Sequence, residues 1–500
     1  MNIVNIMNFV RGIEPRHPER DLLEPVKNQI ALNKRYGFEN TFLIQYDAII
    51  NPAFSELFIK ERDEKTELGV WIEIVRPLAE SVGIAWRGRP GYDWDWWADP
   101  GFLPAYTSVE KEKLIDELME KFREVFGEYP KTAGSWMLDI YSIRYMREKY
   151  HIEAFGICRE QLSVDAYNLW GGPYNQPYYP SVNNVLCPAQ TAENQLNTPV
   201  FRLLGIDPIR GYNESRYSKH PKLKGCATME PVWSYGKSEG YMRWFFKTYF
   251  DNETMGLAYT QIGQENSFGW DSMKDAFPMQ YDLVKEYADA GKIQVLKMCD
   301  AGKLFRERYN STPAASIVAD SDPIKEHDYR SVLYTSKNYR ANLFLDAGKL
   351  YFRDIQKFDE KYTERYLNEP CHNWEAVYDN LPVVDERGWS KEKDSHEAGL
   401  DFEGSYKFKS ASREKDGLIV ICEDDSGKEV KVIFDEAEIT IIGGGNLIWR
   451  FGTFVDYNIK GKNIDFVHNY FAYTVKTEGK LDITEEGLSF KGEERKISFS

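Results

Sequence analysis

The chain has 500 residues, of which 42% are hydrophobic and 15% aromatic, and its formal net charge is −16. This length exceeds the usual size of one hydrophobic core, so we expect more than one domain. The negative charge disfavours binding to nucleic acid and to anionic membranes, and no run approaches the roughly 18 apolar residues of a membrane-spanning helix.

Up to about residue 300, apolar strand-like runs alternate with amphipathic segments. The clearest helix begins after a capping box formed by Thr107 and Glu110, and Gly127 ends it. Such alternation predicts a parallel sheet, and seven or eight repeats predict closure into a barrel. The expected strands are 4–9, 41–46, 69–75, 132–137, 153–158, 200–204, 256–262 and 293–298, and further helices are expected at 24–36, 140–150, 240–250 and 275–290.

From about residue 335 the sequence changes to short alternating runs separated by turn signals such as Asp424-Asp-Ser-Gly427. We therefore expect the α/β class, with a seven- or eight-stranded (β/α) barrel at 1–310 as the catalytic domain. An antiparallel β-rich, sandwich-like accessory domain is expected at 335–500. The connections 83–106 and 160–198 are long and rich in aromatic residues and proline, which favours a functional role over disorder.

Carboxylates follow several expected strands, where α/β barrels place their chemistry. Glu265 lies among amides and glycines after the seventh strand, and Glu14 follows the first. Asp139 precedes the helix 140–150, so it is either an N-cap or a catalytic group. Glycoside hydrolysis needs two carboxyl groups beside the scissile bond. We therefore predict that Asp139 and Glu265 face each other across the barrel, with Glu14 as the alternative acid.

Other side chains near this rim are candidates for binding sugar, because Tyr and Trp combine an apolar face with a hydrogen-bonding edge. We expect at least two of the tryptophans in the long connections to line the cleft. The arginines either neutralise single carboxylates or converge as a clamp for an acidic sugar. The substrate-binding candidates are Arg16, His17, Arg76, Trp94, Trp96, Trp97, Arg159, Trp170, Arg202, Gln261, Gln264 and Trp270.

Metal and cofactor chemistry find little support in the sequence. No two histidines are spaced i, i+3 or i, i+4, and no nucleophile elbow, Walker loop or dinucleotide fingerprint occurs. We expect no metal and no cofactor, although ligands dispersed along the chain remain an alternative. The amino terminus lacks a basic region and a cleavage site, so we expect a cytoplasmic location, with a removed secretion signal as the alternative.

The stretch Gly134-Ser-Trp-Met-Leu-Asp139, with the helix and strand that follow it to Ile157, resembles the glycoside hydrolase/deacetylase barrel superfamily. That superfamily groups family 57 glycosidases with NodB-type polysaccharide deacetylases. The resemblance implies that Asp139 occupies the place of the family 57 glutamate nucleophile. It fits the deacetylases less well, because the chain has Asn8 to Glu14 where they carry paired aspartates and has no His-x-x-x-His motif.

The leading functional hypothesis is a metal-independent glycoside hydrolase acting on a carbohydrate, with an acidic sugar as one alternative. Two other classes stay open: a metal-dependent carbohydrate de-N-acetylase, and a carbohydrate-binding protein without catalysis, since a fold does not fix a function. The sequence leaves the sugar, the stereochemistry and the oligomeric state undecided.

Overall fold

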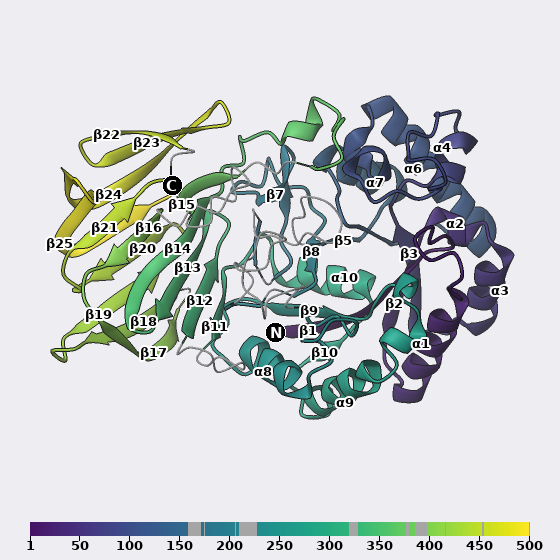
Figure 1. Ribbon diagram of the computed structural model, residues 1–500, viewed down its shortest axis with the longest axis horizontal. Helices are drawn as coiled ribbons and strands as arrows, with labels where there is room; N and C mark the ends of the chain where they lie inside the picture. The colour runs from purple at the N-terminus through teal and green to yellow at the C-terminus, as the bar shows by residue number, and fades with distance from the viewer. Residues whose placement is uncertain are drawn as a thin grey trace.

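The computed structural model describes residues 1–158, 172–174, 176–205, 207–209, 228–319, 329–376, 380–385, 398–415, 417–452 and 455–499. A helical and parallel-stranded half lies beside a half built almost entirely of antiparallel strands (Figure 1). Across these ranges, no helix combines the length and the apolar character needed to span a membrane.

Seven parallel strands form a nearly closed barrel in the order β9–β1–β2–β3–β4–β5–β8. The first half of β1 pairs with β9 and its second half with β2, while β10 adds a two-residue pairing near its start. At the seam, the Leu204 N–H donates to Oε1 of Gln261 over 3.2 Å. This confirms the predicted barrel. The strands are β1 (Asn2–Val10), β2 (Asn40–Ile44), β3 (Thr66–Trp71), β4 (Thr132–Ser135), β5 (Ala154–Cys158), β8 (Val200–Leu203), β9 (Ala258–Ile262) and β10 (Gln294–Val295).

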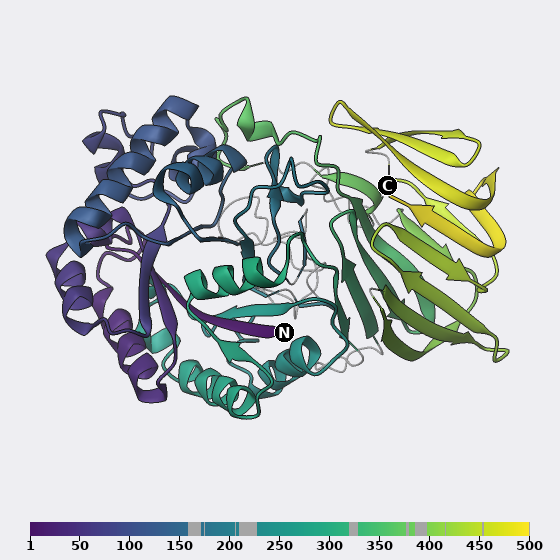
Figure 2. The ribbon, with the colours of Figure 1, turned by 180° about the vertical axis from the view of Figure 1, so that it is seen from behind.

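Helices surround the barrel (Figures 1 and 2), and α10 packs Met298, Ala301 and Phe305 into the apolar cluster inside it. The last strand is therefore shorter than expected, because its predicted end begins this helix. The helices are α1 (Leu23–Tyr36), α2 (Tyr46–Ile49), α3 (Pro52–Glu61), α4 (Arg76–Ser81), α5 (Ala98–Gly101), α6 (Ser108–Phe126), α7 (Ile140–Tyr150), α8 (Glu239–Phe250), α9 (Ala276–Asp289) and α10 (Met298–Arg308), with 3₁₀ turns η1 (Leu103–Ala105), η2 (Asn266–Phe268), η3 (Trp270–Ser272) and η4 (Arg365–Leu367).

Helix α6 begins at the predicted capping box. The Glu110 N–H donates to Oγ1 of Thr107 over 3.4 Å, and the Thr107 N–H donates to Oε2 of Glu110 over 2.9 Å. Thr107→Ala removes one of these bonds, so we expect it to lower the free energy of unfolding by about 1 kcal/mol in urea titrations. Val109→Ala, on the exposed face of the same turn, should stay within roughly 0.5 kcal/mol of the wild type. Equal losses in the two variants would contradict the capping role.

The antiparallel half is one large sheet that folds over on itself. Tyr334 of β12 stacks on Phe434 of β19 with 5.2 Å between ring centroids, which gives the sandwich-like packing. Separately, β6 (Pro180–Ser181) and β7 (Asn184–Pro188) form a hairpin. The strands of the large sheet are β11 (Ala315–Ala319), β12 (Tyr329–Thr335), β13 (Tyr339–Asp346), β14 (Lys349–Lys357), β15 (Leu381–Asp385), β16 (Gly399–Phe402), β17 (Tyr406–Glu414), β18 (Gly417–Asp424), β19 (Glu429–Phe434), β20 (Glu438–Ile442), β21 (Leu447–Arg450), β22 (Asp456–Lys460), β23 (Asn463–His468), β24 (Phe471–Thr484) and β25 (Gly487–Ser498).

Residues 358–376, which follow β14, run back over the barrel near α6 and α7, and we call them the strap (Figure 1). The Glu364 carboxylate accepts the N–H of Ile140 over 2.6 Å and that of Val185 over 2.8 Å. Farther along, the Ala98 N–H donates to the Trp374 carbonyl over 2.9 Å. The β-rich half is therefore joined to the barrel by the contacts of the strap as well as by the chain connection at β11.

Candidate active site

Alternation along β1 and β3 sets the centre of the barrel mouth. Phe9 and Trp71 belong to the apolar cluster inside the barrel and stack at 4.1 Å, and Trp136 packs edge-on against Trp71 at 5.5 Å. Side chains two residues apart share one face of a strand, so Arg11 and Glu73 follow Phe9 and Trp71 on the inward side. A polar layer therefore lies on an aromatic floor.

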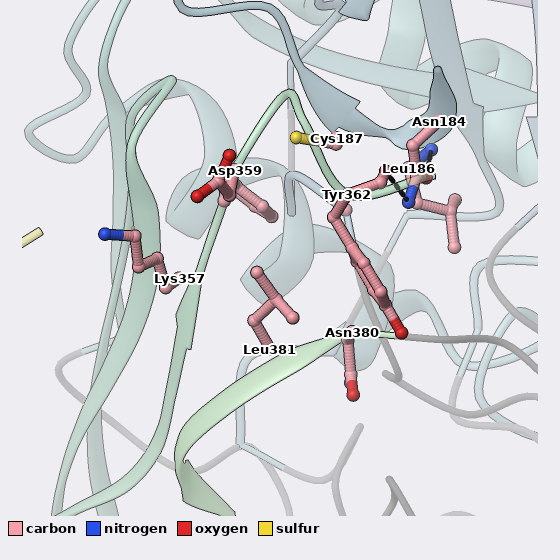
Figure 3. A pocket seen from close by; sticks show the side chains of 10 residues that line it. Asn184, Leu186, Cys187, Lys357, Asp359, Tyr362, Asn380 and Leu381 are labelled. Atoms are coloured by element: carbon pink, nitrogen blue, oxygen red, sulfur yellow. Dashed lines mark hydrogen bonds between the residues drawn. The ribbon is translucent and has the colours of Figure 1, made fainter. Parts of the chain in front are cut away.

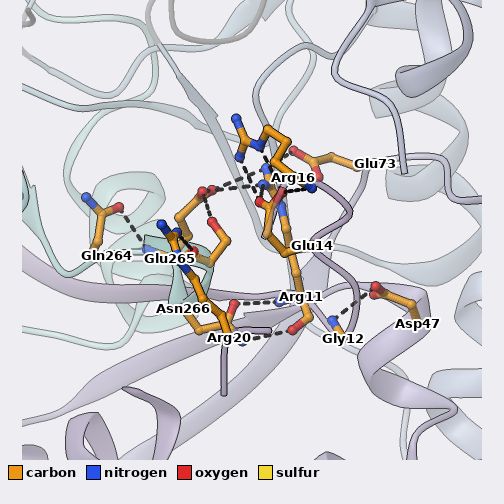
Figure 4. Close-up of polar contacts among 11 residues, drawn as sticks. Arg11, Gly12, Glu14, Arg16, Arg20, Asp47, Glu73, Gln264, Glu265 and Asn266 are labelled. Atoms are coloured by element: carbon orange, nitrogen blue, oxygen red, sulfur yellow. Dashed lines mark hydrogen bonds and ion pairs between the residues drawn. The ribbon is translucent and has the colours of Figure 1, made fainter. Parts of the chain in front are cut away.

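The polar layer is a group of three glutamates around one buried arginine, and we call Arg11, Glu14, Glu73 and Glu265 the Arg11 cluster (Figure 4). Nη2 of Arg11 lies 2.8 Å from Oε1 of Glu73 and 3.2 Å from Oε2 of Glu265. Nη1 of Arg11 lies 3.9 Å from Oε2 of Glu14. Carboxylates that follow β1, β3 and β9 thus meet at one guanidinium.

Polar contacts hold two of the cluster's backbone segments in place. The Arg11 N–H donates to Oδ1 of Asn266 over 2.9 Å, and Nδ2 of Asn266 donates back to the Arg11 carbonyl over 2.8 Å. The Ser267 hydroxyl donates to Oε1 of Glu265. On the other side, the Gly12 N–H donates to Oδ2 of Asp47 over 3.0 Å. The loops after β1 and β9 are therefore fixed to each other beside the three glutamates.

The surroundings shift the pKa values of two of these glutamates in opposite directions. Burial raises the pKa of Glu73, and the charge of Arg11 only partly opposes that rise. Burial would also raise the pKa of Glu14, but the Arg16 hydrogen bonds and the Arg11 and Arg16 charges outweigh it and hold the pKa below its ordinary value. Burial disfavours the charged form of Arg11, yet its three glutamates raise its pKa overall. The surroundings thus favour the ionised form of Glu14, whereas burial works against it at Glu73.

Arg16 binds Glu14 in a two-pronged pair, with Nε 2.8 Å from Oε1 and Nη2 2.7 Å from Oε2. In Arg16→Gln the loss of this charge should raise the pKa of Glu14 toward or above about 4.3, the value for free Glu. Carboxyl-carbon NMR titration of Glu14 measures this directly and needs no substrate. Arg76→Gln is the matched control, because Arg76 is exposed and pairs with Glu80 and Asp93. A Glu14 that titrates alike in both variants would refute the role of Arg16.

The predicted tryptophans join this site in different ways. Trp94 is 0% exposed, and the Arg11 guanidinium lies 3.9 Å above its ring, so it belongs to the core. Trp96 and Trp97 are half-buried, and the Arg89 guanidinium lies 4.0 Å and 4.5 Å from their rings. Trp170 lies outside the described residues. Trp96 and Trp97 therefore remain the candidates for contact with a ligand.

The remaining predicted binders are spread around the mouth. Arg16 lies 5.0 Å from the Trp94 ring and 5.1 Å from the Trp96 ring, which places it beside the cluster. Arg76 lies on the surface, and half-exposed His17 pairs with Glu19 over 3.5 Å. Arg159 lies outside the described residues, and Trp270 stacks on Phe277 at 6.0 Å in the apolar cluster that α8 and α9 share with β9.

The amides after β9 bind protein groups. Gln261 closes the seam between β8 and β9, as described above. Oε1 of Gln264 accepts the Glu265 N–H over 2.8 Å, and its Nε2 donates to Oε1 of Glu230 over 3.1 Å. Glu230 was missed from the sequence, because it lies in a segment without strand or helix character. Gln264 thus connects a fourth buried carboxylate to Glu265.

Cys158, the last residue of β5, shows that these charges share one region. Burial raises the pKa of its thiol, the charges of Glu230, Glu265 and Glu73 raise it further, and Arg202 opposes them. The predicted Arg202 is buried within electrostatic reach of the same centre. The barrel mouth therefore gathers charged groups that follow β3, β8 and β9.

Asp139 occupies a different cluster from Glu265. Its Oδ1 accepts the Ser142 N–H over 2.9 Å at the start of α7, and lies 3.1 Å from Nζ of Lys111. Its charge also raises the pKa of Glu364 in the strap, after burial, to about 8. In the described part of the chain, no hydrogen bond or ion pair joins Asp139 to Glu14 or Glu265. The contacts match the N-cap alternative that the sequence left open.

A metal ion does not fit the groups that the structure describes. Within those ranges, no set of three or more His, Cys, Asp and Glu side chains is arranged to hold one. The densest group of carboxylates is the Arg11 cluster, and there the guanidinium already lies among the oxygens and would repel a cation. We therefore derive no reaction step through a metal.

Cavities near these groups differ in character. An open depression of about 470 Å³ lies against the loop after β1 and includes Glu14 in its lining. A small cavity of about 20 Å³ lies where the strap meets β7 and β15 (Figure 3). Asp359 is the one carboxylate among the residues that line this second cavity, with Lys357 as the cation. A third cavity, beside the strap and the start of α7, is lined by Asp139 and Glu364, so paired carboxyl groups occur there as well as at the barrel mouth.

Residues 25–317, more than half of the chain, match the family described as a domain of unknown function with a solved structure, DUF3863. The chain belongs to this family. No curated protein matches it. The DUF3863 match runs from α1 into β11 and includes Glu73 and Glu265, whereas β1, Arg11 and Glu14 precede it.

The comparison with solved structures gives matches at low identity. A protein from Parabacteroides distasonis, provisionally named a glycoside hydrolase/deacetylase, is 15% identical with a TM-score of 0.55, over 78% of this chain and 93% of that one. A provisionally named polysaccharide deacetylase from Mycobacterium smegmatis is 11% identical with a TM-score of 0.37, over 61% and 91%. The first similarity establishes a shared fold.

Proposed function

We propose that the chain is a carbohydrate-active hydrolase that cleaves a glycosidic bond at the Arg11 cluster. The observation that carries the proposal is the convergence of Glu14, Glu73 and Glu265 on one buried arginine at the carboxyl ends of the barrel strands. Barrel enzymes place their reactive groups at this end. The shared fold with a protein provisionally named a glycoside hydrolase/deacetylase supports the same class of chemistry.

Spacing supports a pair of carboxyl groups acting on one bond. Glu14 and Glu265 each place an oxygen near Nη1 of Arg11, at 3.9 Å and 3.3 Å. These two oxygens are therefore no farther apart than the sum of the two distances. That limit covers the roughly 5–5.5 Å between the carboxyl groups of retaining glycosidases and the lower end of the about 6.5–9.5 Å of inverting enzymes, so it fits either mechanism.

The contacts of the glutamates suggest their roles. Glu265, which Arg11 and the Ser267 hydroxyl hold in place, would contact the substrate and protonate the leaving oxygen as the glycosidic bond breaks. Ionised Glu14 would act from the other side, as a nucleophile or as the base that takes a proton from water. Arg11 would orient Glu265 without touching the sugar, and Trp96 and Trp97 would offer ring faces to the substrate. Asp139 has no part in this scheme, and its role would be the N-cap of α7.

Wild-type protein incubated with aryl glycosides and, in parallel, with N-acetylated sugars tests the class of reaction. Release of the aryl group, lost in Glu14→Gln and kept in Asp139→Asn, is the expected result. Release of acetate without cleavage would indicate a de-N-acetylase instead. Tight sugar binding with no turnover of either kind would indicate a binding protein.

A further inference from the structure

An open depression beside the β1–α1 loop shares Glu14 with the Arg11 cluster, and the rest of its lining takes no part in the proposed chemistry. Its volume of about 470 Å³ falls within the range of small-molecule binding sites, roughly 300–1,000 Å³. It takes in the β1–α1 loop, one residue of α3 and two residues of the aromatic loop before α5.

Two contacts connect this depression to the Arg11 cluster. Glu14 lines the depression, yet its side chain is 1% exposed because it turns to Arg11 and Arg16. Arg20 lines it too, and its Nη1 donates to the Ser267 carbonyl, while the Ser267 hydroxyl donates to Glu265 (Figure 4). Glu14 therefore belongs to both the depression and the Arg11 cluster, and Arg20 connects the depression through Ser267 to Glu265.

The lining combines apolar surface with unused polar atoms. Ile13, Leu22 and Leu23 are half-buried there. In the described part of the chain, Nε and Nη2 of Arg20 have no hydrogen-bond partner, because its one contact uses Nη1. Asp21 uses Oδ1 to accept the Leu23 and Glu24 N–H groups, which leaves Oδ2 open. Apolar patches ringed by donors and acceptors suit the two faces of a sugar ring.

Charge narrows the class of ligand. Glu14, Asp21 and Asp93 line the depression together with Arg20 and the titratable His17, so anionic and cationic groups are mixed. The carboxylates of this lining would repel a chain of uronic acids about as much as its cationic groups would attract one. The net charge of −16 adds to the repulsion. Neutral sugar units fit it better than an acidic polymer.

We propose that this depression binds the neutral sugar units adjoining the one that reacts, so that the substrate is an oligosaccharide or polysaccharide rather than a simple glycoside. The proposal rests on the proposed function, because it places the reacting bond at the Arg11 cluster. It adds the class of substrate and a site that extends from the loop after β1 to Asp93.

The test compares neutral aryl glycosides of increasing chain length, in gluco, manno, xylo, galacto and N-acetylglucosamine series. We expect kcat/KM to rise about tenfold or more once a second or third unit is added, the gain of one or two hydrogen bonds. Asp93→Trp places a bulky ring in the depression and should abolish the gain in kcat/KM with chain length. Val109→Trp, at an exposed position on α6, is the matched control and should keep the gain.

Binding to an array of the same sugars by Glu265→Gln protein separates the two proposals. If binding depends on chain length, Asp93→Trp removes it and the wild type shows no turnover, the proposed sugar site in the depression is supported and the proposed glycosidase activity is refuted. Turnover that does not depend on chain length, or that depends on it equally in Asp93→Trp, would refute the proposed role of the depression and leave the proposed glycosidase activity standing. Failure of every neutral oligosaccharide to bind or react would also refute the proposed role of the depression.

Discussion

Glu265→Gln is expected to lower turnover by a factor on the order of 10² to 10⁴, the usual contribution of acid–base catalysis. Glutamine keeps the shape of the side chain and its bond with Ser267, but it has no proton to give to a leaving oxygen. Aryl substrates with good leaving groups need little protonation, so their rates should fall least. The measurement is kcat across leaving groups of increasing pKa, on a sugar that the wild-type protein cleaves.

Two matched variants make this result specific. Asp139→Asn keeps the N-cap geometry of α7 and should leave kcat near the wild-type value, because Asp139 contacts Lys111 and Ser142 and not the cluster. Ser267→Ala removes one hydrogen bond to Glu265 and should cost about tenfold or less, a typical value for one bond. Equal losses in Glu265→Gln and Asp139→Asn would restore the pairing predicted from the sequence, and no loss in either would remove the cluster from the reaction.

Strand and helix positions in the barrel could be read from the sequence because each depends on local pattern. The run before Glu265 and the capping box at Thr107 both specify structure within a few residues, and both lie where the pattern placed them. The end of the last strand was misjudged because Met298 turns inward as the first residue of α10 rather than as part of β10. That choice depends on packing inside the barrel, which local pattern does not encode.

The site was harder to predict because its members meet only after the barrel closes. Glu14 and Glu265 were recognised as strand-end carboxylates, and the structure brings them together at Arg11. Arg11 and Glu73 each follow an inward aromatic residue by two positions, and this shared spacing was the one signal in the sequence that could have identified them. Asp139 has the same strand-end position as Glu265, so only its contacts with Lys111 distinguish the two.

Aromatic content was an equally ambiguous guide. Trp94 and Trp96 are two residues apart in one loop, yet Trp94 is buried against Arg11 whereas Trp96 is half-buried between Arg16 and Arg89. A tryptophan beside a buried cation stabilises that cation, and one nearer the surface can meet a ligand. The sequence shows both as loop tryptophans and cannot assign the two roles.

Arg11→Met should destabilise the fold by about 3–5 kcal/mol, the cost of breaking a buried ion pair by removing one partner. Methionine fills much of the same space, but Glu14, Glu73 and Glu265 would lose the charge that now holds them together. Without Arg11, nothing opposes the burial that raises the pKa of Glu73, so this pKa in the folded protein should lie further above that in the unfolded chain. A raised carboxyl pKa favours folding below the unfolded value and loses that advantage as the pH rises through the folded value. The deficit, measured by urea unfolding, should therefore be small near pH 4 and grow toward neutral pH.

A second substitution identifies the source of this loss. Glu73→Gln in the Arg11→Met background removes one uncompensated charge and should recover part of the stability at neutral pH, whereas Glu80→Gln on the surface should recover none. The interaction energy from this double-mutant cycle should be large only for the first pair. A deficit in Arg11→Met that is the same at every pH would instead reflect lost packing against Trp94, and would mean that the arginine is kept for its shape rather than for its charge.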